Sequence, residues 1–318
     1  MTRDGEMELR RRPEELATLY FLEPEIRDVI VEGRGDRNFF TWFVSETPSR
    51  GLVRVYAVSD RVDLPDSELI KYGLLTGQRS RVLHLSNVLS ELGVDSGAAR
   101  LVMDADLVSI GLDADAENDL LLRTDFSALE AYAFNERTMN KLLRMGLGAP
   151  ETVTAADVLT AVTPGLVTLF LIRACLRESG CGAAVPNKAF EKIFSATSLP
   201  ITVGEIFQDA LNGTGKAERG ATTKESLLKR FGELEKLVTG DPRHFVNGHD
   251  ISELVVQFLK ARCKSVFNRD TTRTYQAGPS LELLLMGKVD LNDLRHPLFE
   301  KLEQWLRESS CPDSAPPV

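Results

Sequence analysis

The sequence Val29-Ile30-Val31-Glu32-Gly33-Arg34-Gly35-Asp36 joins a run of β-branched residues to a glycine-rich turn. The β-branched run predicts a buried strand, and the apolar, aromatic segment after Asp36 predicts a helix. A strand that ends at Glu32 in such a turn holds this carboxylate at the carboxyl edge of a sheet, where α/β proteins bind their ligands. The glycines also leave room for a ligand to approach the backbone closely.

A second apolar run, Leu101-Val102-Met103, ends in Asp104-Ala105-Asp106. Both aspartates share one face if the strand geometry continues, because alternate residues of a strand point the same way. A right-handed crossover would place this strand beside or near the first. We therefore expect Glu32, Asp104 and Asp106 to surround Mg²⁺, with Mn²⁺ as an alternative and Asp36 as a further candidate. The competing interpretation is that the aspartates cap the next loop and that Glu32 pairs with an arginine.

Strand and helix patterns alternate in the first half of the chain. The predicted strands are 27–31, 52–58, 100–104 and 120–124, and helices are predicted at 36–45 and 78–92. Buried, continuously apolar strands alternating with helices predict an α/β fold whose mainly parallel sheet is flanked by helices.

Helical periodicity dominates the rest of the chain, and predicts a large additional α-helical region. The longest predicted helix, 154–178, has Thr154 as its cap and Pro164 as an interruption. Shorter helices are predicted at 203–212, 222–237, 251–262, 279–286 and 295–308. We expect an N-terminal arm (1–25), a catalytic domain (26–135), a helical insertion or second domain (136–240), a C-terminal helical region packing back on the core (241–308) and a disordered tail (309–318).

The composition is that of a soluble globular protein, with 43% hydrophobic and 27% charged residues among 318. The net charge of −9 argues against a generally basic nucleic-acid coat, but leaves room for a local basic patch. No apolar run is long enough for a transmembrane helix and the N-terminus lacks a secretory signal, so we expect a cytoplasmic protein without a membrane partner. The 4 widely spaced cysteines indicate free thiols rather than a zinc site.

Positive charge is concentrated at Lys260, Arg262, Lys264 and Arg269, with Phe267 and Tyr275 nearby. Cations with interleaved aromatic residues suit a nucleic-acid backbone, and Arg34 and His249 are further candidates for this contact. The alternatives are a solvated helix end for the basic segment and, for Asn247-Gly248-His249-Asp250, a plain turn with Asp250 as a helix N-cap.

Taken together, these motifs resemble the Toprim family of topoisomerases, primases and OLD-type nucleases. The resemblance rests on Val31-Glu32-Gly33-x-x-Asp36, on Asp104-Ala105-Asp106, on Thr124-Asp125-Phe126-Ser127-Ala128-Leu129-Glu130 and on Gly248-His249-Asp250. The last two stretches are similar to those of Toprim proteins of bacterial defence loci, including the nuclease that partners an ABC-type ATPase in PARIS antiphage systems. The match covers 26–135 well and 247–250 loosely.

The resemblance implies a metal-dependent endonuclease that cleaves RNA such as tRNA, or DNA, as a toxic effector controlled by an ABC-type ATPase. It implies that Glu32 is a metal ligand or general base and that Asp104 and Asp106 hold the metal. By the same resemblance, Asp36, Asp125 and Glu130 are second-tier ligands, which would serve a second metal ion. The alternative for Asp125 and Glu130 is a role as helix-cap and salt-bridge partners. A homodimer is also expected. The alternatives are a non-catalytic Toprim scaffold that binds a partner or nucleic acid, and a primase-like nucleotidyl transferase.

Overall fold

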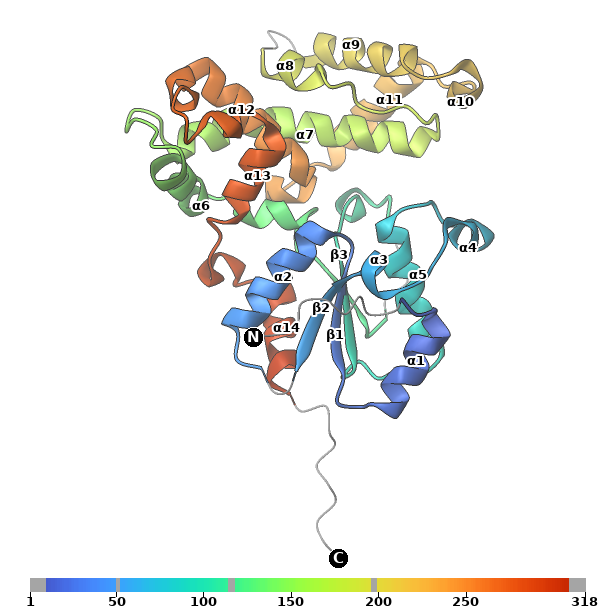
Figure 1. The fold of residues 1–318 in the computed structure, drawn as a ribbon. Helices are drawn as coiled ribbons and strands as arrows, with labels where there is room; N and C mark the ends of the chain where they lie inside the picture. Colours follow the sequence, from blue (N-terminus) through green and yellow to red (C-terminus); the bar gives the residue numbers. More distant parts are fainter. Residues whose placement is uncertain (1–9, 50–51, 114–117, 196–198, 309–318) are drawn as a thin grey trace, which may run out of the picture. The chain divides into compact units, whose positions relative to one another are not determined.

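The computed structural model describes residues 10–49, 52–113, 118–195 and 199–308. It divides the chain into two compact units (Figure 1). The first consists of the described residues of Met1–Asp104, Asp115–Asp125 and Arg295–Val318, and the second of those of Ala105–Ala114 and Phe126–Leu294. The first unit is therefore discontinuous in sequence. The domain boundaries predicted above are continuous segments in chain order, and they remain predictions.

The first unit is built on a parallel four-stranded sheet with the order β2-β1-β3-β4. The strands are β1 (Arg27–Val31), β2 (Val53–Ala57), β3 (Ala99–Met103) and β4 (Leu121–Arg123). All five residues of β1 are buried, as expected for a central strand covered on both faces. The prediction of an α/β fold with a parallel, helix-flanked sheet is thus confirmed, and the predicted strands agree with the observed ones to within a residue or two.

Helices cover both faces of this sheet (Figure 1). They are α1 (Pro13–Leu22), α2 (Arg34–Glu46), α3 (Val58–Arg61), α4 (Asp66–Lys71), α5 (Gln78–Glu91) and α14 (Pro297–Arg307). On one face, Phe299 of α14 packs against Phe40 and Phe43 of α2, with ring centroids 5.9 and 5.0 Å apart. On the other face, α1 and α5 share one apolar core with β1 and β3. The bounds of α2 and α5 lie within two residues of the predicted ones.

Two buried charged residues of β1 form hydrogen bonds to the helices that pack on the sheet. Asp28 accepts hydrogen bonds from Tyr20 at 2.9 Å and from Arg61 at 3.0 Å, and all three side chains are buried. Arg27 donates to backbone carbonyl oxygens at the end of α14, including Trp305 and Glu308, the latter at 3.0 Å. A cation at a helix C-terminus donates hydrogen bonds to carbonyl groups that lack helical partners, and it interacts favourably with the negative end of the helix dipole.

The second unit is helical. Its α-helices are α6 (Glu136–Lys141), α7 (Ala155–Ser179), α8 (Ala189–Phe194), α9 (Leu199–Asn212), α10 (Lys216–Arg219), α11 (Lys224–Leu234), α12 (Gly248–Cys263) and α13 (Gly278–Met286). One π-turn spans Leu142–Gly146, and 3₁₀ turns span Val108–Ile110, Leu129–Ala133, Glu235–Leu237, Pro242–Phe245, Lys264–Phe267, Arg273–Gln276 and Leu291–Leu294. The large helical region expected from periodicity is therefore present.

Helix α7 is the longest element of the second unit. Thr154 caps it as predicted, accepting the N–H of Asp157 at 3.1 Å. The predicted interruption at Pro164 is wrong, because the helix continues through this residue. By length and composition α7 is apolar enough to cross a membrane, but 56% of its most apolar window is buried inside the protein. It packs against α8, α11 and α12, which is consistent with a core helix of a soluble protein.

Three of the cysteines, Cys175, Cys181 and Cys263, are free and buried, which confirms the prediction of free thiols for these residues. Burial raises the pKa of the Cys175 thiol to about 12, so this group is protonated at neutral pH and unreactive. Cys311 and the predicted disordered tail lie outside the described residues.

Candidate functional site

The direction of strand addition reverses at β1, because β2 lies on one side of it and β3 on the other. In open parallel sheets, such a reversal leaves a crevice at the carboxyl ends of the two strands, where ligands bind. Glu32 directly follows β1 and Asp104 directly follows β3. Glu32 Oε1 accepts the backbone N–H of Asp104 at 3.0 Å, and both residues are half-buried. The structure thus brings together two of the acidic residues predicted from the sequence; we name them the strand-end pair.

The glycine-rich turn after Glu32 starts a helix. Gly33 is the N-cap of α2, and Asp36 Oδ2 accepts the Gly33 N–H at 2.9 Å. The Asp36 carboxylate therefore stabilises the first turn of α2, where a negative charge is favoured by the helix dipole. Arg34 is 80% exposed and lies 3.9 Å from Asp60, so its guanidinium is accessible from solvent.

Arg79 also lies at this edge, although no motif in the sequence predicts it there. It belongs to the first turn of α5, is half-buried, and donates through Nη1 to the carbonyl oxygen of Asp104. Its guanidinium therefore lies next to the backbone of Asp104 and places a positive charge at this edge of the sheet. No local pattern links Arg79 to Asp104, because they meet only when α5 packs beside β3.

Asp106 belongs to the second unit, and its backbone is left-handed, with a φ of 49°. The strand alternation that predicted a shared face for Asp104 and Asp106 is wrong, because β3 ends at Met103. The Asp106 carboxylate forms an ion pair with Arg177 of α7 at 2.5 Å. Arg177 also contacts Asp113 at 3.0 Å, so one guanidinium bridges two aspartates.

Two motif stretches far apart in sequence meet in the second unit. Ser127 Oγ donates to the carbonyl oxygen of Val246 at 2.6 Å. Glu130 lies directly against Gly248, since a Cβ atom placed on this glycine would be 1.9 Å from Glu130 Oε2. The absence of a side chain at Gly248 therefore allows Glu130 to approach the N-terminus of α12.

The same region holds a group of metal-ligand side chains, Glu130, His249 and Glu282, whose donor atoms lie within 4.8 Å of one another. We name it the turn cluster. His249 Nδ1 lies 2.8 Å from Glu282 and 4.0 Å from Glu130. The hydrogen bond to Glu282, reinforced by the charges of Glu282, Glu130 and Asp250, raises the pKa of His249 to about 9. Histidine with carboxylates suits Zn²⁺ or Mn²⁺ better than Mg²⁺, and a metal would have to displace the His249 proton.

The sequence predicts Glu130 as a metal ligand and His249 as a nucleic-acid contact, two different roles, and it gives no indication of Glu282 at this position. Glu282 lies on α13, and only the packing of α13 against α12 brings it to His249.

Two further acidic candidates have structural partners. The alternative N-cap role of Asp250 is wrong, because Asn247 occupies the N-cap position of α12 and the buried Asp250 carboxylate pairs with Arg173 at 2.6 and 2.9 Å. Burial raises the pKa of Asp250, and the Arg173 pair opposes that shift. Asp125 accepts the N–H of Leu298 at 3.2 Å in the first turn of α14, which agrees with the helix-cap alternative.

The basic segment lies at the end of α12 and beyond it. Lys260, Arg262, Lys264 and Arg269 are all exposed, as a nucleic-acid contact requires. Phe267 is only 2% exposed, so the proposed interleaving of this ring with the cations is wrong. The phenyl ring fills the core instead of offering a stacking surface.

No protein-family model and no curated protein matches this chain. Its class is therefore defined by structure, as an α/β protein with an all-parallel sheet and acidic residues at the strand ends. This architecture is compatible with a Toprim-like fold.

Proposed function

We propose that this protein is a Mg²⁺-dependent endonuclease of the Toprim type. The observation that carries the proposal is the contact between Glu32 Oε1 and the Asp104 N–H, 3.0 Å long, at the strand reversal of a parallel sheet. Two carboxylates at such a position form a ligand set of hard oxygen atoms.

The strand-end pair fits the demands of Mg²⁺, which keeps several waters and needs only one or two protein carboxylates. Glu32 and Asp104 would hold the ion, and the bond from the Asp104 N–H orients the Glu32 carboxylate. When bound, the metal would activate a water molecule and neutralise charge on a phosphodiester. Arg79, which donates a hydrogen bond to the Asp104 carbonyl oxygen, adds positive charge at this edge of the sheet.

The remaining features of the proposal rest on the Toprim resemblance. They are a role for Asp106 as a third ligand, a substrate that is RNA such as tRNA or else DNA, control by an ABC-type ATPase, and assembly as a homodimer in the cytoplasm. The exposed Lys260, Arg262, Lys264 and Arg269 would contact the nucleic-acid backbone.

A non-catalytic scaffold is the second candidate, and one observation favours it. Three of the predicted metal ligands are engaged by the protein itself: Asp106 by Arg177, Asp36 by the Gly33 N–H and Asp125 by the Leu298 N–H. Carboxylates in such contacts have structural roles that need no metal.

The two candidates are separated by a cleavage assay with a panel of tRNA, single-stranded DNA and duplex DNA, in Mg²⁺, Mn²⁺ or EDTA. The wild type is compared with Glu32→Gln and Asp104→Asn, which remove charge but little volume. Glu46→Gln is the matched control, since Glu46 is an exposed carboxylate of the same unit at the end of α2. Calorimetric titration with Mn²⁺ provides a readout that does not depend on activity.

We expect metal-dependent cleavage by the wild type and by Glu46→Gln. In Glu32→Gln and Asp104→Asn the cleavage rate should fall by at least about 100-fold, which corresponds to an increase of about 2.7 kcal/mol in the activation free energy. We also expect Mn²⁺ binding to weaken in the same two variants. Cleavage that persists in EDTA, or Mn²⁺ affinity unchanged by Glu32→Gln and Asp104→Asn, would overturn the assignment. Undetectable cleavage and undetectable Mn²⁺ binding in the wild type would favour the scaffold.

A further inference from the structure

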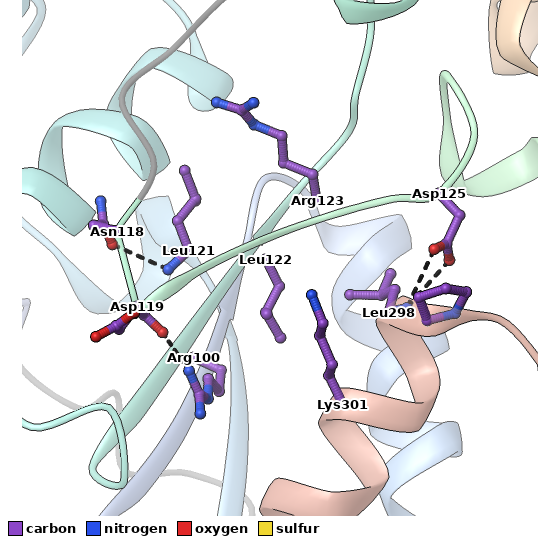
Figure 2. Close-up of a pocket in the computed structure, with 10 residues that line it drawn as sticks. Arg100, Asn118, Asp119, Leu121, Leu122, Arg123, Asp125, Leu298 and Lys301 are labelled. Atoms are coloured by element: carbon purple, nitrogen blue, oxygen red, sulfur yellow. Dashed lines mark hydrogen bonds between the residues drawn. The ribbon is translucent and has the colours of Figure 1, made fainter.

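A pocket of about 630 Å³ lies at the edge of the sheet in the first unit, lined by β4, the segment before it and the start of α14 (Figure 2). It exists because β4 is the last strand in the order β2-β1-β3-β4 and has no further strand beside it. Its volume lies in the range of small-molecule sites. None of the functions proposed above uses it.

One wall of this pocket is apolar. It is formed by Leu122 of β4 together with Pro297 and Leu298 at the start of α14. Leu122 is only half-buried, so the pocket leaves part of a strand side chain uncovered. The face of a planar aromatic ring, such as that of a nucleobase, would bury this surface when it lies against it.

Of the three cations that line the pocket, Arg100, Arg123 and Lys301, the first and the last are the candidates for binding an anion. Lys301 extends from α14 into the space beside Leu122 (Figure 2), and has no hydrogen bond or ion pair to any other residue that the structure describes. Arg100 of β3 donates to the carbonyl oxygen of Asp119, while its buried Nε has no hydrogen-bond partner in the described part of the chain. Burial lowers the pKa of Arg100, and the negative charges of Asp119, Glu308 and Asp95 oppose this shift.

The neighbouring polar groups are already satisfied by the protein. The Asn118 side chain accepts from the N–H groups of Leu120 and Leu121 and donates to Ser86 and Asn87. Asp125 accepts the Leu298 N–H. Three cations (Arg100, Arg123 and Lys301) and two carboxylates (Asp119 and Asp125) line the pocket, so positive charge exceeds negative charge by one.

We propose that this pocket binds a nucleoside monophosphate, either free or as one unit of a nucleic-acid strand. The phosphate is held by Lys301 and Arg100, and the base lies against Leu122, Pro297 and Leu298. Arginine and lysine are suited to a phosphate, and a guanidinium can bind it through two N–H groups. This inference does not depend on the nuclease proposal, because it involves neither the strand-end pair nor a metal.

The test is calorimetric titration of the full chain in EDTA with AMP, CMP, GMP and UMP, each singly, with inorganic phosphate, and with a ribotetranucleotide. Lys301→Glu reverses the charge of an exposed residue, so it should fold normally. Lys236→Glu, an exposed lysine of the second unit, is the matched control. We expect at least one monophosphate to bind, with an affinity reduced about tenfold or more by Lys301→Glu and unchanged by Lys236→Glu.

Absence of binding at millimolar monophosphate, or binding equal in the wild type and Lys301→Glu, would overturn the proposal. Inorganic phosphate binding as tightly as the best monophosphate would also overturn it, because the apolar wall would then contribute nothing. A tetranucleotide that binds more tightly than the monophosphate supports a strand as the source, and equal affinities support a free nucleotide. Monophosphate binding that is retained in Glu32→Gln would show that this pocket acts independently of the proposed nuclease site.

Discussion

His249 shows how single residues acquire their properties from packing. In the sequence it is one histidine in an Asn-Gly-His-Asp turn, whereas in the structure it lies between Glu130 and Glu282. Its pKa of about 9 lies above the ordinary value of 6.5, so the folded protein binds this proton more tightly than the unfolded chain. The stabilisation is complete below pH 6.5, decreases above it, and is lost as the pH rises through about 9.

We predict that Glu282→Gln lowers the pKa of His249 toward its ordinary value, because the first cause of the shift is the hydrogen bond to Glu282. The measurement is an NMR titration of the His249 ring between pH 5 and pH 10. Glu225→Gln, at an exposed site on α11, is the control and should leave the titration unchanged. An unshifted midpoint in Glu282→Gln would show that the turn cluster does not form as described.

At the scale of elements, the contact of α7 with α8 and α12 depends on a buried glycine. A Cβ atom on Gly165 would lie 2.7 Å from Ile193 and 3.0 Å from Leu254, closer than packed carbon atoms tolerate. The glycine allows the three helices to pack closely.

We predict that Gly165→Ala destabilises the second unit by about 1–3 kcal/mol, the usual cost of overpacking. Gly232→Ala is the matched control within α11, since no atom lies within 4 Å of the added Cβ. It should instead stabilise by about 0.5–1 kcal/mol, because alanine loses less backbone entropy in a helix. Urea unfolding followed by the helical circular dichroism signal gives both values, and a stabilising Gly165→Ala would contradict the packing.

At the scale of the whole molecule, the first unit is completed by the end of the described chain. Trp305 of α14 is 2% exposed, donates through Nε1 to Ser96 at 2.8 Å, and lies under the Arg27 guanidinium at 4.0 Å from the ring centroid. The central strand β1 and the last helix therefore form one packed structure, although most of the chain separates them.

We predict that Trp305→Ala destabilises the first unit by about 3–5 kcal/mol, as expected for removal of a large buried aromatic side chain. Hydrogen exchange should then become faster in β1, while α7 of the second unit serves as the internal reference. Glu300→Ala, an exposed position of the same helix, should change stability by less than about 0.5 kcal/mol. Unchanged protection of β1 in Trp305→Ala would show that α14 does not stabilise the sheet.

Local sequence patterns predicted most helices and strands, and they predicted the positions of Glu32 and Asp104 in the candidate site. The run Val29-Ile30-Val31 and the glycines after it were sufficient for β1 and the start of α2, because strand burial and helix capping depend on nearby residues. The same logic placed Glu32 and Asp104 at strand ends. It failed at Asp106, where the strand alternation does not continue, and at Pro164, where α7 continues.

Amino-acid order alone was enough to predict the parallel α/β sheet, the helical remainder and the acidic strand ends, since each is encoded by periodicity over a few residues. Packing between distant segments was needed to place Arg79 at Asp104, Arg177 at Asp106, and Glu282 at His249. It was also needed to form the pocket at β4, whose apolar wall comes from residues 122 and 297–298. The physical reason is that these contacts join side chains on different elements, and no local propensity specifies which partner a side chain meets once the elements pack.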